Sequence, residues 1–308
     1  MAIISLKFTL MAKKSKESKM EKLKQLLSFI TAPIEFIQNH FKAMVFLLIV
    51  VLIFMPSDDE SLMPHNLEKI ALAGPIMDVN DVVKKLDEAR LNSKIKGVLL
   101  VVDSPGGAVS PSIEVAYAVK RLKESKPVVV YASGTIASGS YYSSIWANEI
   151  VANPGSMVGS IGVIMQGANL SEVMQKIGIK TQIVSAGKYK QLGTSDREWT
   201  PYEKEELSKV IQGTYEMFVH DVATARKLKI EDAPNFADAH IFTASQAKAV
   251  GLVDKLGVSY DAEADLIKLS GVKEPIWNKE DPMDKIIKKL SAATALTLNT
   301  YFPALSLR

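Results

Sequence analysis

The stretch Tyr131-Ala-Ser-Gly-Thr-Ile-Ala-Ser-Gly-Ser-Tyr-Tyr142 holds two serine–glycine pairs at a point where the chain is expected to turn. It follows Pro127-Val-Val-Val130, an apolar, β-branched run that is typical of a buried strand. It leads into Ile145-Trp-Ala147, where an apolar helix could begin. At a strand-to-helix turn, a serine hydroxyl is exposed beside the free N–H groups of the helix N-terminus. Catalytic serine nucleophiles are found in this position. Ser133 and Ser138 both fit this pattern, so the turn alone leaves two candidate nucleophiles.

Apolar runs and helical patterns alternate on both sides of this stretch. Short runs that are typical of strands lie at residues 69–73, 97–102, 128–131, 150–152 and 181–184. Helical spacing is seen at residues 79–91, 112–123 and 170–177, in a long segment from Pro201 to about 227, and in a closing strand–helix unit at 243–254. This alternation predicts an α/β fold with a mainly parallel sheet and flanking helices.

The composition limits the chemistry that the chain can carry. Its 308 residues are enough for one sizeable domain with additional segments. Cysteine is absent, which excludes disulfides, thiolate metal sites and a cysteine nucleophile. The four histidines, His40, His65, His220 and His240, lie far from the serine motif. The sequence therefore offers no histidine near the serines for a Ser-His-Asp triad. We expect neither a metal nor a cofactor.

The basic charge is concentrated ahead of an apolar run. Residues 1–42 carry eight lysines and three glutamates, whereas the rest of the chain carries 29 basic and 31 acidic side chains. A nucleic-acid-binding protein would carry the basic charge on its folded domain, so that class is not expected. Residues 43–55 are thirteen apolar residues without a break. With 36–42 as an extension, they predict a single membrane anchor with a cytoplasmic N-terminus and an exported remainder.

The rest of the chain divides into three parts. No small-x-small cleavage pattern follows the apolar run, which argues against a cleaved signal peptide. Residues 56–66 are expected to be a linker. Residues 67–257 contain the predicted α/β domain. Residues 258–308 form a C-terminal tail, in which 283–290 is amphipathic at helical spacing.

A glycine pair ends another predicted strand, in Asp103-Ser-Pro-Gly-Gly107. Successive glycines let the backbone approach a ligand and turn N–H groups toward it, which is what an oxyanion hole requires. An ordinary turn would explain the same residues. The motif lacks the GxGxxG and Walker spacings, so nucleotide binding is set aside.

A serine nucleophile needs a group that accepts its proton, and here that group has to be a residue type other than histidine. A free lysine has a pKa of about 10.4, and desolvation lowers this value by several units when no carboxylate pairs with the amine. Lys188 and Lys190 lie in Ser185-Ala-Gly-Lys-Tyr-Lys-Gln-Leu192, where no acid occurs before Asp196. The residues leave either lysine as the candidate base.

From about Leu67 to Gly257, the chain resembles the signal peptide peptidase A family of membrane-anchored serine–lysine proteases. The resemblance rests on ordered motifs, namely Asp-Ser-Pro-Gly-Gly at 103–107, Ala-Ser-Gly-x-Tyr-Tyr at 137–142, Gly-Ser-Ile-Gly-Val at 159–163, Gly-x-Tyr-Lys at 187–190 and Ser-Asp-Arg-Glu at 195–198. It implies a Clp/crotonase-like fold and a ring-shaped homo-oligomer whose sites are completed by neighbouring subunits.

The resemblance also implies a role for each site residue. Ser138 matches the nucleophile and Lys190 the general base, whereas Ser133 and Lys188 fall outside these positions. Gly107 and Gly139 match the source of the oxyanion-hole N–H groups, and Ser160 matches the serine that orients the lysine amine. Ser140 departs from the glycine that is more usual after Ser138-Gly139, and its hydroxyl could narrow the nearest substrate pocket.

The sequence thus predicts a membrane-tethered serine endopeptidase with a Ser-Lys dyad. In keeping with the family, its substrates would be remnant signal peptides or other apolar, unfolded segments near the membrane. Two alternatives remain open at this point. One is a catalytically silent relative that binds peptides or scaffolds a complex, and the other is a crotonase-type acyl-thioester enzyme that uses a carboxylate for acid–base work.

Overall fold

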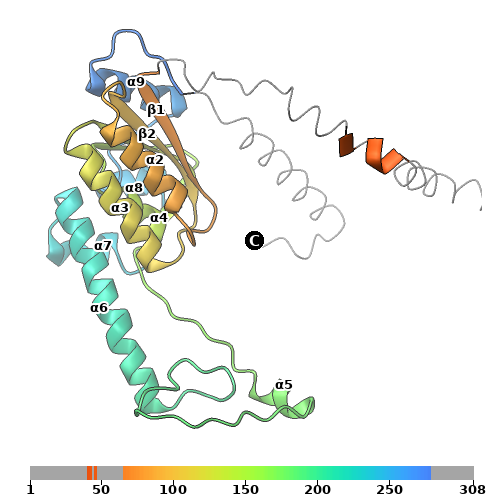
Figure 1. The fold of residues 1–308 in the computed structure, drawn as a ribbon. Helices are drawn as coiled ribbons and strands as arrows, with labels where there is room; N and C mark the ends of the chain where they lie inside the picture. The colour runs from red at the N-terminus through yellow and green to blue at the C-terminus, as the bar shows by residue number, and fades with distance from the viewer. Residues whose placement is uncertain (1–39, 44, 47–64, 279–308) are drawn as a thin grey trace, which may run out of the picture. The chain divides into compact units, whose positions relative to one another are not determined.

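The structure, a computed structural model, describes residues 40–43, 45–46 and 65–278 (Figure 1). The chain divides into two units, Met1–Met63 and Pro64–Arg308. In the first unit, residues 40–43 and 45–46 are helical. No helix in the described residues has the length and apolar character needed to cross a bilayer. Four predicted segments lie wholly or mostly outside the described residues: the basic segment 1–42, the anchor 43–55, the linker 56–66 and the amphipathic segment 283–290.

Seven strands of the described region form one mainly parallel sheet, which confirms the predicted class. Its central order is β1-β2-β3-β4-β7, with bounds β1 Leu67–Ala73, β2 Gly97–Ser104, β3 Val128–Ala137, β4 Glu149–Ala152 and β7 Lys255–Leu256. The short β5 (Met157–Gly159) pairs in parallel with the end of β3 and antiparallel with β6 (Ile241–Thr243). The carboxyl ends of β2, β3 and β5 are therefore neighbours.

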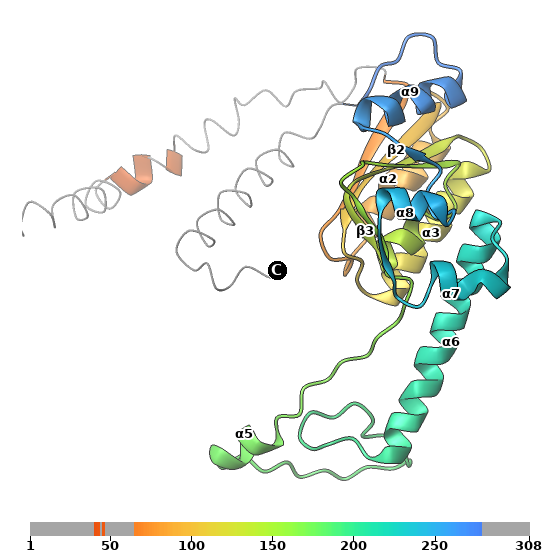
Figure 2. The same ribbon diagram turned by 180° about the vertical axis from the view of Figure 1, so that it is seen from behind.

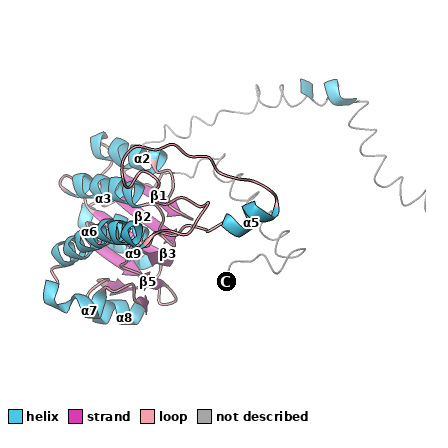
Figure 3. Ribbon diagram, turned by 90° about the horizontal axis from the view of Figure 1, so that it is seen from below, coloured by secondary structure: helices cyan, strands magenta, loops and turns pink. Residues whose placement is uncertain are grey.

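Alternate strand residues enter two separate cores on the two faces of the sheet. Val98 and Leu100 of β2 join the larger core, together with α2 (Asn80–Leu91), α3 (Val109–Lys123) and α4 (Gly139–Ser144). Leu99, between them, joins a smaller core under α9 (Ser259–Ser270). Figures 2 and 3 show the strands as a layer between these helices. The packed body thus extends past Gly257, the predicted end of the domain.

The long helix α6 (Pro201–Arg226) confirms the helix predicted from Pro201. Thr200 and Glu203 form a capping box, and Pro201 occupies the first turn, where its missing N–H costs nothing. Smaller helices complete the second unit: α5 Ser171–Lys176, α7 Ala233–Phe236 and α8 Ala244–Ala249, with a 3₁₀ turn at Ile230–Asp232.

Two local predictions were wrong. Residues 181–184 do not form a strand, because they lie in the exposed connection between α5 and α6, where no partner strand is present within the described residues. The turn after residue 131 also comes later than expected, because β3 continues to Ala137. The next helix accordingly begins at Gly139 rather than near Ile145.

Candidate active site

Ser138, Ser160 and the loop that carries Gly107 follow three neighbouring strand ends. Ser104 at the end of β2 pairs with Ile136 of β3, and Ala137 of β3 pairs with Gly159 of β5. The Ser138 amide donates to the Gly159 carbonyl at 2.8 Å. In open α/β sheets, ligands bind outside the carboxyl ends of the strands. The sheet therefore brings the predicted site serines to the edge where a ligand site is expected.

Ser138 occupies a strained turn between β3 and α4. Its backbone has φ 52° and ψ −123°, a conformation that L-residues rarely adopt. The next residue, Gly139, is the first residue of α4, and the Tyr142 amide donates to the Ser138 carbonyl at 3.0 Å. A serine on a sharp, strained strand-to-helix turn has the geometry of a nucleophile elbow. Strain of this kind persists where the surroundings impose it, commonly at functional sites.

Ser133, the other candidate nucleophile, has no such geometry. It lies inside β3, and its hydroxyl donates to the Val102 carbonyl at 3.2 Å. It does not line the pocket that contains Ser138. The structure therefore separates the two serines by backbone conformation and by position.

The amides of Gly107 and Gly139 lie close together beside Ser138. A Cβ built on Gly139 would be 3.3 Å from the Gly107 nitrogen. Ile76 bonds to the two neighbours of Gly107, donating to the Gly106 carbonyl and accepting from the Ala108 amide, each at 2.8 Å. Because strand N–H groups alternate in direction, the Gly107 N–H faces away from Ile76. Within residues 65–278, no hydrogen bond takes up either glycine N–H group, so both can donate to a ligand oxygen.

Neither Gly107 nor Gly139 has room for a side chain. A Cβ on Gly107 would be 2.1 Å from the Ile76 carbonyl oxygen, and a Cβ on Gly139 would be 2.2 Å from the Ser112 hydroxyl. Gly107 is thus required by its close approach to Ile76, and Gly139 by its close approach to Ser112 of α3.

Ser140 lies beneath the elbow rather than in the pocket. Its side chain is fully buried, and its hydroxyl bonds to the Ser104 carbonyl at 2.7 Å and accepts from the Ala137 amide at 2.8 Å. It is not among the pocket-lining residues. The expected narrowing of the substrate pocket by this hydroxyl is therefore not seen. Instead, the hydroxyl joins the end of β2 to the elbow.

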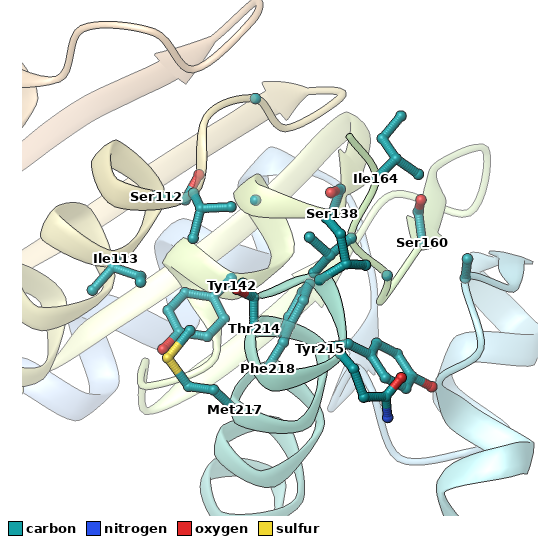
Figure 4. A pocket seen from close by; sticks show the side chains of 18 of the residues that line it. Ser112, Ile113, Ser138, Tyr142, Ser160, Ile164, Thr214, Tyr215, Met217 and Phe218 are labelled. Atoms are coloured by element: carbon teal, nitrogen blue, oxygen red, sulfur yellow. The ribbon is translucent and has the colours of Figure 1, made fainter. Parts of the chain in front are cut away.

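A cavity of about 620 Å³ opens beside Ser138 (Figure 4). Gly107, Gly139 and Ser160 line it together with Ser138, so four of the five predicted site residues share one pocket. Most of the remaining wall is apolar and comes from several elements: Ile113, Tyr142, Val163, Ile164, Met217 and Phe218. A pocket with an apolar wall and a few convergent polar groups is suited to an apolar side chain of a bound molecule.

Helix α6 supplies one wall of this pocket, which the sequence analysis did not foresee. Phe218 packs edge-on against the Tyr142 ring, with centroids 5.0 Å apart. The Tyr142 hydroxyl donates to the Asp221 carboxylate at 2.5 Å. Burial, with the hydrogen bond to Asp221 as a second cause, raises the pKa of Tyr142, so this hydroxyl remains a donor at neutral pH. The apolar positions on one side of α6 were the available signal, but they are equally typical of a core helix.

Ser160 lies directly after β5, across the pocket from α3 (Figure 4). Its backbone has φ 50°, and its amide donates to the His240 carbonyl at 2.7 Å. The hydroxyl therefore belongs to a fixed backbone position on the pocket wall. It is placed to hydrogen-bond a group that enters the pocket near Ser138.

Lys190, the predicted base, is not among the residues that line the pocket. It is exposed, and it lies in the connection between β5 and α6 that extends away from the sheet (Figures 1 and 2). We refer to residues 165–200 as the arm. The arm is tied to the start of α6, since the Tyr189 ring contacts the Tyr202 ring at 5.8 Å. Because Tyr202 and Ile211, the first pocket residue on α6, are nine positions apart on one helix, about 14 Å of helix axis separates them.

Many large apolar side chains of the arm face solvent. Val184 is fully exposed, and others are about half exposed: Met165, Leu170, Val173, Ile177, Ile179 and Ile183. None of the residues of α5 is buried. So many large exposed apolar side chains on one segment are uncommon on the surface of a soluble protein.

Comparisons with known proteins identify the family to which the chain belongs. The model of peptidase family S49 matches residues 120–273, half of the chain, which include Ser138, Gly139, Ser160 and Lys190. A putative protease of Methanocaldococcus jannaschii is 44% identical over 64% of this chain, and a putative protease of Synechocystis is 38% identical over 61%. A putative signal peptide peptidase SppA of Enterococcus faecium is 33% identical over 60%.

The aligned stretches span 64%, 69% and 54% of the lengths of these three relatives. The family match at residues 120–273 includes the ordered motifs at 137–142, 159–163, 187–190 and 195–198, and begins after the Asp-Ser-Pro-Gly-Gly motif at 103–107. The resemblance inferred from those motifs is thus confirmed, and the chain belongs to peptidase family S49, the family of signal peptide peptidase A.

Proposed function

We propose that the protein is a serine endopeptidase in which Ser138 is the nucleophile. The observation that carries this proposal is the conformation of Ser138, a strained elbow residue beside two unpaired glycine amides at the edge of an apolar pocket. A half-buried serine hydroxyl that lines a pocket, beside two N–H groups, provides the nucleophile and the oxyanion donors that acyl transfer from a peptide bond requires.

The proposed reaction begins when the Ser138 hydroxyl attacks a peptide carbonyl and gives its proton to the Lys190 amine. The amides of Gly107 and Gly139 donate to the oxyanion that forms on the carbonyl oxygen. The lysine ammonium then protonates the leaving amine as the peptide bond breaks, which leaves an acyl ester on Ser138. Water, deprotonated by the neutral lysine, hydrolyses this ester and restores the serine.

Lys190 is proposed to serve the Ser138 of another copy of the chain. Tyr189 contacts Tyr202 at the start of α6, whereas the pocket lies farther along this helix, next to Thr214 and Phe218. A continuous helix holds these two points apart. The exposed apolar side chains of the arm, moreover, need a partner surface. A homo-oligomer, proposed as a ring in keeping with the family, would bury the arm and bring the amine to a neighbouring pocket.

Two observations support Lys190 over Lys188 as the base. The Lys188 amine lies over the rings of Tyr189 and Tyr202, 5.2 and 5.0 Å from their centroids. Cation–π contacts stabilise the charged ammonium, which is the wrong form for a base. Lys190 has no such ring contact among the described residues. A neighbouring pocket would desolvate its amine, and the Ser160 hydroxyl would orient it.

The substrates are proposed to be extended apolar peptides such as remnant signal peptides. The apolar pocket wall supports this class, because it would bind an aliphatic side chain next to the scissile bond. Residues 43–55 would tether the protein to the membrane and leave the catalytic unit on the exported side. A topology reporter fused at the C-terminus should report an exported location, and a cytoplasmic signal would contradict this orientation.

A fluorophosphonate probe tests the nucleophile directly. The probe forms a covalent bond with an activated serine, so incubation of the full chain followed by peptide mass spectrometry should place the adduct on Ser138. Labelling at Ser133 would move the nucleophile to that residue. An absence of labelling, together with hydrolysis of a coenzyme A thioester, would favour the acyl-thioester alternative, since Asp238 also lines the pocket and could act as its carboxylate.

A further inference from the structure

We propose that Arg197 and Glu203 are positioning residues that hold the loop carrying Lys190 in its catalytic geometry. This inference rests on the proposed function, because it assumes that Lys190 is the base. Within residues 65–278, this ion pair makes six hydrogen bonds or more through its two side chains and their partners, and the proposed reaction gives it no role. We define the Lys190 loop as residues 185–194.

The Glu203 carboxylate is buried, and both of its oxygens accept hydrogen bonds. Its side chain has no exposed surface, and Arg197 donates to both of its oxygens at 2.8 Å. The Thr200 amide and hydroxyl add bonds to Oε2 at 2.8 and 2.9 Å. The hydrogen bonds from Arg197, as the largest cause, lower the pKa of Glu203 to about 2. The carboxylate is therefore charged at any working pH, and it anchors the guanidinium at the first turn of α6.

Arg197 connects this anchor to the residue next to Lys190. Its Nη2 donates to the Gln191 Oε1 at 3.3 Å, in addition to its bond with Glu203. The Gln191 Nε2 donates in turn to the Ser185 hydroxyl at 3.2 Å. A single chain of bonds thus runs from the buried carboxylate through the guanidinium to Gln191 and across the Lys190 loop.

The other side of Lys190 is held by aromatic contacts. Tyr189 packs edge-on against Tyr202, and the Lys188 amine lies over the same Tyr202 ring. The Trp199 indole also donates to the Thr194 carbonyl at 2.8 Å, which closes the end of the loop. Lys190 is therefore flanked by two residues that are both fixed to the start of α6, while its own side chain remains exposed.

This arrangement has a mechanistic consequence. A lysine has four rotatable bonds, so the position of its amine depends on the position of its backbone. A misplacement of about 1 Å in a catalytic group costs about 100-fold in rate. Helix α6 extends from Glu203 to the pocket wall. The Arg197–Glu203 pair therefore fixes the Lys190 loop to a rigid element of the catalytic unit.

The test is a double-mutant cycle with Arg197→Met and Lys190→Met, measured in the full chain with a peptide substrate and an activated ester. With Lys190 present, Arg197→Met should lower kcat about 100-fold and change KM little. With Lys190→Met, the residual ester activity should not fall further when Arg197 is also changed.

Two further variants separate positioning from stability. Lys204→Met removes an exposed ion pair with Glu198 at the same turn of α6, and it should leave kcat unchanged. Arg197→Met combined with Glu203→Gln removes the unpaired buried charge but keeps a capping side chain, so thermal stability should recover while kcat remains low. Size-exclusion profiles should match that of the unchanged protein.

The outcomes are distinguishable from a failure of the proposed function. Full activity in Arg197→Met, with Lys190→Met inactive, would overturn the positioning role and leave the dyad in place. Equal losses from Arg197→Met in both backgrounds would also overturn it, because a purely structural role acts regardless of Lys190. Full activity in Lys190→Met would remove both the dyad and this inference.

Discussion

Replacing Ser138 with alanine is expected to abolish peptide cleavage, lowering kcat by about 10⁴-fold or more. The loss follows because the variant lacks the hydroxyl at the elbow, and the nearby Ser112 hydroxyl already donates to the Ala108 carbonyl. The serine side chain has no hydrogen-bond partner within the described residues, so the folded unit should keep its stability and its assembly. Cleavage of a fluorogenic apolar peptide, with circular dichroism and size-exclusion chromatography, checks both parts. Retained cleavage would contradict the assignment.

Ser138→Gly serves as a matched control for the strain at this position. It should be as inactive as Ser138→Ala, because both lack the hydroxyl. Glycine, however, adopts φ 52° without the steric penalty of a Cβ. The glycine variant should therefore be more stable than the alanine variant by about 1 kcal/mol, which thermal or urea unfolding can measure. Equal stabilities would show that the elbow holds no strain.

Replacing Lys190 with methionine is expected to lower kcat by about 10³-fold, because the serine then has no proton acceptor while the oxyanion hole remains. Methionine keeps a similar length and removes the amine. Lys188→Met is the matched control, since Lys188 lies on the same loop as Lys190 and its amine lies over the rings of Tyr189 and Tyr202. It should retain most of the activity. A loss in Lys188→Met together with activity in Lys190→Met would transfer the base role to Lys188.

Much of the fold could be predicted because its signals are local. The continuous apolar run that became β2 and the proline-capped start of α6 are both explained by their own residues. The strand predicted at 181–184 failed because a strand needs a partner, and that segment has none within the described chain. Hydrophobic pattern alone does not reveal whether an apolar run meets a neighbouring strand or another molecule.

The extent of β3 shows why sequence reasoning could not decide between the two serines. Gly134 indicated a turn, yet it lies within β3, where the Asp103 carboxylate occupies the space that a side chain would need. Asp103 also accepts a bond from the Thr135 amide at 2.8 Å. These residues are some 30 positions apart, so their contact is a property of the folded sheet.

The sequence predicted individual motifs of the site but not how they are arranged around the pocket. The glycine pair and the serine elbow were visible as motifs, and the structure brings them to one pocket. The pocket wall formed by α6 was missed, because apolar residues on a helix indicate burial without indicating what they cover. The distance between the pocket and the Lys190 loop depends on the course of α6 and could be obtained only from the structure.

The central claim, that one copy supplies Ser138 and another supplies Lys190, is tested most directly by mixing two inactive variants. Ser138→Ala and Lys190→Met chains with different affinity tags would be co-expressed, and assemblies that contain both would be isolated through the two tags in turn. With random mixing, about a quarter of the sites should pair an intact serine with an intact lysine, so cleavage should return to about that fraction. Mixed assemblies that remain as inactive as each parent would contradict a site shared between copies.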